Sequence, residues 1–122
     1  MYARGWSILP EWVAVKHPHL PLPVFASGLG PGECEAIALA EELAADVLLA
    51  DDGAARIEAV NRNIPVQGTL GVLDLAAEHG LVDFENALGK LRNTNFRASR
   101  KLIQFFTERD AQRKRLKSER DG

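Results

Sequence analysis

The sequence predicts an α/β domain in which a short parallel sheet is flanked by helices in three layers. Short apolar or β-branched runs alternate with longer stretches that have helical spacing. Segment 46–50 is an almost continuous apolar run, short enough for a buried parallel strand. This alternation indicates βαβ units with right-handed crossovers, and 122 residues are expected to form one domain.

The first half of the chain predicts two strands and one strong helix. Residues 12–15 are aromatic and β-branched, which favours a short strand. A connection rich in proline and glycine follows. Residues 33–43 are alanine-rich with acids in the first turn, as in a helix whose dipole is complemented. The second strand is expected at residues 46–50.

The second half predicts one more strand among helices. Residues 53–61 have apolar side chains at helical spacing, and a third strand is expected at residues 64–67. Thr69 and Asp83 are expected to cap two further helices, and Gly80 to end the first of them. Ser99 is expected to start the last helix. Beyond Glu108 the chain is almost wholly polar, and we expect it to fray or project into solvent.

Charge is distributed unevenly along the chain. Residues 1–96 carry 6 Lys/Arg against 13 Asp/Glu, whereas residues 97–122 carry 9 against 4. We therefore expect a domain at residues 1–108 and a basic polar tail at residues 109–122, which either steers nucleic acid or forms a solvated helix face. A single cysteine favours a cytoplasmic protein. The sequence contains no apolar run of the length that a membrane span needs.

Four acids lie where strand ends and helix starts are expected to meet. Glu33 and Glu35 begin the first helix, and Asp51 and Asp52 follow the second strand. Four carboxylates at one edge repel one another unless a positive group lies between them. Mg²⁺ or Mn²⁺, which prefer oxygen ligands, are the natural candidates. The alternative is that these acids only cap helices and loops.

Three segments in order, GECEAIALA (32–40), DVLLADDGAAR (46–56) and VQGTLGVL (66–73), resemble the C-terminal half of a PIN domain of the VapC toxin type. The resemblance implies a Rossmann-like parallel sheet and metal-dependent hydrolysis of RNA. Glu35 and Asp52 best match the catalytic acids, and Glu33, Glu35, Asp51 and Asp52 match the metal ligands. RNA and a protein antitoxin are the implied partners.

The sequence departs from the family pattern at its start. PIN domains begin with a strand that ends in Asp, and residues 1–11 contain no such strand. We therefore expect a PIN-like sheet that lacks the first strand, weak binding of Mg²⁺ or Mn²⁺ and an inactive or incomplete nuclease. The unpaired edge that remains predicts a homo-oligomer. The alternative functions are a non-catalytic oligomerising interaction module with a basic tail, and a phosphate binder that uses helix N-termini.

Overall fold

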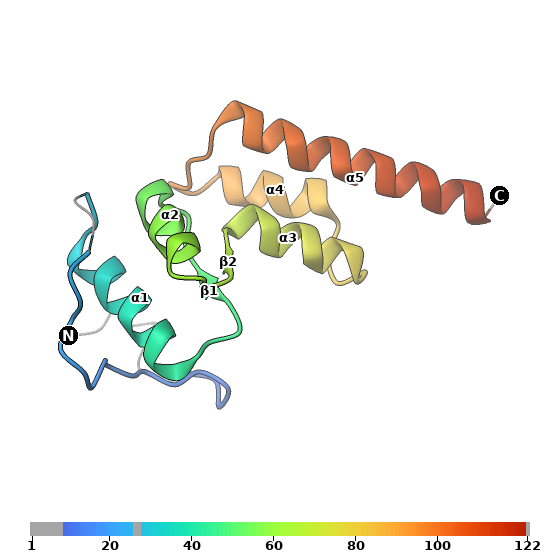
Figure 1. The fold of residues 1–122 in the computed structure, drawn as a ribbon. Helices are drawn as coiled ribbons and strands as arrows, with labels where there is room; N and C mark the ends of the chain where they lie inside the picture. Colours follow the sequence, from blue (N-terminus) through green and yellow to red (C-terminus); the bar gives the residue numbers. More distant parts are fainter. Residues whose placement is uncertain (1–8, 26–27, 122) are drawn as a thin grey trace.

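The computed structural model describes residues 9–25 and 28–121. The elements in chain order are α1 (Pro31–Leu43), β1 (Leu48–Leu49), α2 (Gly53–Asn61), β2 (Val66–Gln67), α3 (Thr69–Glu78), α4 (Phe84–Arg92) and α5 (Arg100–Asp121). Figure 1 shows the strands between α1 and α2 on one side and α3, α4 and α5 on the other. The predicted α/β class is confirmed.

The sheet consists of two parallel strands, with Leu48 opposite Val66 and Leu49 opposite Gln67. Both strands are shorter than the sequence predicted, but each lies inside its expected segment. The N–H of Ala50 donates to the carbonyl oxygen of Gln67 at 2.9 Å, which extends the pairing one residue past β1. Because the strands are parallel, their carboxyl ends share one edge of the sheet.

The strand expected at residues 12–15 is wrong. Trp12 lies in a turn and is 84% exposed, and Val13–Lys16 has no regular structure. A strand is stabilised by hydrogen bonds to a neighbouring strand, and in the described residues this segment has none. Its aromatic and β-branched composition is therefore not sufficient to make it a strand.

Two separate clusters of buried side chains form the interior. The first joins α1 and α2 to the sheet, and its buried members are Ile37, Ala40, Ala55, Ala59 and Ile64. The second joins α3, α4 and α5, and its buried members are Leu70, Phe84 and Leu88. Small side chains let α1 and α2 approach closely, whereas the helical cluster is filled by large ones.

The predicted helix boundaries are mostly confirmed. Asp83 caps α4, since its Oδ2 accepts from the N–H of Asn86 at 3.0 Å. Gly80 follows α3 with a φ of 73°, a conformation that favours glycine. The prediction that Thr69 is an N-cap is wrong. Gly68 occupies that position, and the acceptor for the N–H of Thr69 is the carboxylate of Asp51.

The last helix does not fray after Glu108. Helix α5 continues without a break to Asp121, and Asp110 within it is only 2% exposed. In Figure 1 the end of α5 reaches beyond α3 and α4. None of the helices in the described part of the chain is long and apolar enough to cross a membrane.

Candidate metal site at the carboxyl end of the sheet

Asp51 joins the end of β1 to the start of α3. Its Oδ1 accepts from the N–H of Thr69 at 2.7 Å, and its Oδ2 accepts from the Thr69 hydroxyl at 2.6 Å. Gly68, the residue between β2 and α3, has no Cβ, which would lie 2.9 Å from Oδ1 of Asp51, so the carboxylate can approach the backbone closely. Asp51 therefore supplies from 18 residues away the cap that the start of α3 needs.

Asp52 and Glu33 each lie at the start of a helix and use one carboxylate oxygen there. Asp52 caps α2, with Oδ2 accepting from the N–H of Ala55 at 3.0 Å. Glu33 lies in the first turn of α1, and its Oε1 accepts from the N–H of Gly30 at 2.7 Å. Both acids complement the positive end of a helix dipole. The capping role that the sequence offered as an alternative is therefore real for these two acids.

Three of the four predicted acids share one cavity. Glu33, Asp51 and Asp52 line a cavity of about 270 Å³ between the first turn of α1 and the carboxyl end of β1. Its remaining wall is made of small and apolar residues: Gly32, Ala36, Ile37, Leu48, Leu49, Ala50 and Ala55. The structure thus brings the helix-start and strand-end acids to a single place.

Glu35 does not line this cavity. It is exposed, and its Oε2 lies 3.9 Å from Nδ1 of His17 on the segment that precedes α1. Two residues along a helix correspond to a rotation of about 200°, so Glu33 and Glu35 face nearly opposite directions. Of the two helix acids, Glu33 is the one that the structure places beside Asp51 and Asp52.

The cavity offers the right donor chemistry for a hard cation but not a complete site. Carboxylate oxygens are the ligands that Mg²⁺ and Mn²⁺ prefer. Residues 9–25 and 28–121 nevertheless contain no group of three or more acidic, histidine or cysteine side chains close enough together to hold a metal ion. The three carboxylates are also each engaged by a backbone N–H. As they are placed, these three carboxylates do not form a complete coordination shell for a metal ion.

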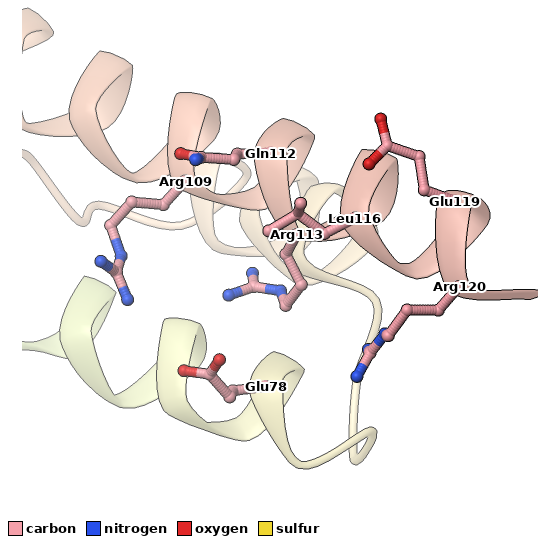
Figure 2. Close-up of a pocket in the computed structure, with 7 residues that line it drawn as sticks. All are labelled: Glu78, Arg109, Gln112, Arg113, Leu116, Glu119 and Arg120. Carbon is pink, nitrogen blue, oxygen red and sulfur yellow. The ribbon is translucent and has the colours of Figure 1, made fainter.

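A larger hollow of about 540 Å³ lies between α3 and the second half of α5. Figure 2 shows Arg109, Arg113 and Arg120 reaching from α5 towards α3, where Glu78 faces them. Arg109 and Arg113 are both within 3.1 Å of the buried carboxylate of Asp74. These two guanidinium groups therefore hold the helices together rather than offering free charge.

The buried carboxylates Asp74 and Asp110 were missed from the sequence. Asp110 accepts from Arg113 at 2.8 Å, and its ion pair with Lys114 at 2.9 Å raises the pKa of that ammonium group. A signal for Asp74 did exist, since it is the one charged residue between Thr69 and Ala77, in a strongly apolar helix. A lone acid in such a helix indicates a buried ionic partner.

Comparison with known families identifies the chain. The model of a PIN-domain family, DUF3368, matches residues 5–111. The chain belongs to this family of PIN domains, as the three ordered sequence segments predicted. No curated protein and no solved structure gave a significant match.

Proposed function

We propose that this chain is a PIN domain of the toxin ribonuclease type whose acidic cavity attracts Mg²⁺ or Mn²⁺. The observation that carries the proposal is the cavity shared by Glu33, Asp51 and Asp52. PIN domains generally use divalent metals, and this cavity lies at the carboxyl edge of a parallel sheet, where α/β proteins bind their ligands. Glu35, the best match to the helix acid of the family, lies outside this cavity. RNA and a protein antitoxin are the proposed partners of the chain.

The chain by itself binds the metal weakly and does not cut RNA at a useful rate. Three carboxylates that already accept backbone hydrogen bonds leave most of the metal's coordination to water. Hydrolysis of a phosphodiester needs the attacking water and the phosphate held in a defined geometry. Without further ligands the carboxylates of this cavity provide attraction for the cation but not that geometry.

Incubation of single-stranded RNA with the full chain and Mn²⁺ tests this part of the proposal. We expect no more cleavage than with Asp52→Asn, which removes a charge from the cavity. Asp46→Asn is the matched control, since Asp46 is exposed at the other end of β1. Cleavage by the parent chain and by Asp46→Asn that Asp52→Asn abolishes would contradict the proposal and would show a complete site.

A second candidate function is that of an oligomerising interaction module. In the described residues β1 pairs only with β2, so its other edge is open. Leu49 is 64% exposed beside that edge, and Val72 of α3 is also exposed. Open edges with apolar side chains favour association. We propose a homo-oligomer that covers this edge, and a stable monomer in light scattering at micromolar concentration would contradict it.

A further inference from the structure

A second cavity also has Asp51 in its wall, but its charged side chains carry a net positive charge. It encloses about 330 Å³ between the end of β2, the first turn of α3 and residues 96–99. Asp51 lines both this cavity and the acidic one. Arg56 of α2 and Arg97 before α5 line only the second. Its volume is at the lower end of the range of about 300–1,000 Å³ that is typical of ligand pockets.

The two arginines of this cavity, the half-buried Arg56 and the exposed Arg97, are not paired with carboxylates of the described residues. Arg62, Arg109 and Arg113 each form ion pairs with carboxylates. In the part of the chain that the structure describes, neither Arg56 nor Arg97 has a carboxylate within 4 Å, although Nη1 of Arg97 donates to the carbonyl oxygen of Phe96 at 3.0 Å. Two guanidinium groups with unmatched charge therefore line one cavity.

The first turn of α3 adds to this positive potential. Gly68 is buried, and a Cβ atom added to it would lie 2.9 Å from Oδ1 of Asp51 and 3.6 Å from Nη1 of Arg56. Glycine thus admits the close approach of Asp51, and Nη1 of Arg56 lies near the N-terminus of α3, where the helix dipole is positive. The Asp51 carboxylate does not neutralise the cavity fully, because it brings one negative charge against the two positive charges of Arg56 and Arg97.

We propose that this cavity binds a backbone phosphate of single-stranded RNA through Arg56 and Arg97. Guanidinium groups match phosphate oxygens in geometry and charge. Because Asp51 is a wall of both cavities, a strand with one phosphate here lies next to the acidic cavity. The inference rests on the proposed function, which makes RNA the ligand, and it adds the residues that hold the strand.

The test is binding of a short, fluorescein-labelled single-stranded RNA to the full chain, measured by fluorescence anisotropy in EDTA. We expect Arg56→Gln and Arg97→Gln each to weaken binding about fivefold and the double variant to weaken it further. Each substitution should also lower the slope of log K against log salt by about 0.7. Arg56→Lys should restore part of the affinity, which distinguishes lost charge from a changed fold.

Arg92→Gln on α4 and Arg115→Gln on α5 are the matched controls. Both residues are exposed, lie outside this cavity and form no ion pair within the described residues. We expect each control to bind RNA within about twofold of the parent. Circular dichroism of every variant verifies that the helices are intact.

Four results would overturn the inference. The first three are no RNA binding by the parent chain, unchanged RNA binding by the double variant, and an equal loss of RNA binding in Arg92→Gln or Arg115→Gln. The fourth is a labelled polyglutamate peptide that binds as tightly as RNA and is weakened equally by the substitutions of Arg56 and Arg97. Because EDTA removes divalent metals, the result does not depend on the acidic cavity. Failure of metal binding would overturn the proposed function while leaving this RNA measurement interpretable.

Discussion

The acidic half of the molecule (residues 31–67) and the helical half (residues 69–121) are stabilised in different ways. Three of the five buried residues in the first cluster are alanines, and one edge of β1 has no partner among the described residues. The helical half encloses Phe84 and Leu70 and is joined by ion pairs to the buried Asp74 and Asp110. Larger buried side chains contribute more to stability.

The difference indicates a division of labour. We expect the helical half to supply more of the packing energy, because its buried side chains are larger, whereas the acidic half presents carboxylates and an open sheet edge. Asp51 links the two halves, since it follows β1 in the chain and its carboxylate accepts from the N–H of Thr69 at the start of α3. If this account is correct, substitutions in the helical half should change stability most, and those in the acidic half should change ligand binding most.

The largest expected effect comes from the buried aromatic residue of the helical half. Phe84→Ala should lower the free energy of unfolding by about 3–5 kcal/mol, because it removes a ring that is 1% exposed and leaves a cavity. Ile37→Ala in the acidic half should lower the free energy of unfolding by about 2–4 kcal/mol. Urea denaturation at equilibrium measures both.

Phe105→Ala is the control for Phe84→Ala, since Phe105 is 55% exposed on α5. Loss of this ring should lower the free energy of unfolding by about 1 kcal/mol or less. A larger cost for Ile37→Ala than for Phe84→Ala would contradict the comparison between the two halves.

The next largest effect should come from the buried carboxylate of α3. Asp74→Ala leaves Arg109 without its carboxylate and Arg113 with Asp110 alone, and we expect a loss of about 2–3 kcal/mol in the free energy of unfolding. Glu85→Ala is the control, because Glu85 is exposed and lies 3.8 Å from Lys114. It should cost less than about 0.5 kcal/mol. Equal effects of the two substitutions would show that the ion pairs of Asp74 do not hold α5 on α3.

A smaller effect is expected for Arg62, which ties the acidic half to the segment before it. Arg62 pairs with Glu58 and with Glu41, and Nη2 donates to the carbonyl oxygen of Val24 at 2.9 Å. Arg62→Ala should lower the free energy of unfolding by about 1–2 kcal/mol. Arg92→Ala, at an exposed position, is the control. Limited proteolysis should then cut near Val24 faster in Arg62→Ala than in the parent.

The smallest effect is a pH dependence at the cap of α4. The pKa of Asp83 is lowered because its carboxylate accepts a hydrogen bond from the N–H of Asn86 and interacts with Lys114. A lowered folded-state pKa stabilises the fold above the unfolded pKa of about 3.9, and this contribution is lost as pH falls through the folded-state pKa.

Asp83→Asn keeps the capping acceptor but removes this charge. We expect the parent to be more stable than the variant at neutral pH, and the difference to shrink as the pH falls below about 4. Urea titrations across that range measure it. A difference that grows on acidification would contradict the assigned cause.

Much of the fold was predictable because its signals are local. Range 53–61 was predicted as it is observed, and the helix that ends at Glu78 was predicted with its start one residue late, from apolar spacing and composition. The errors concern partners that are distant in the sequence. Residues 12–15 have the composition of a strand but no neighbouring strand, and the N–H of Thr69 is capped by Asp51. Likewise, contacts between α5 and Asp74 keep the chain helical after Glu108.

The sequence predicted at which edge of the sheet the candidate site lies, but it did not predict every residue that lines the site. Strand ends and helix starts predicted that four acids, Glu33, Glu35, Asp51 and Asp52, would meet at this edge, and all of them except Glu35 line one cavity. Glu35 was preferred over Glu33 because it matches the family motif better. In the structure the two side chains are separated by about 200° around α1, and Glu33 is the one that lines the cavity. The second cavity was not predictable, since Arg56 and Arg97 come together only through the fold.

The central claim is that the acidic half gathers carboxylates into a weak site for a divalent cation. Titration with Mn²⁺ followed by electron paramagnetic resonance tests it most directly, because free and bound Mn²⁺ give different signals. We predict weak binding by the parent chain, lost in Asp51→Asn, Asp52→Asn and Glu33→Gln and unchanged in Asp46→Asn. No binding by the parent, or an equal loss in Asp46→Asn, would contradict the account.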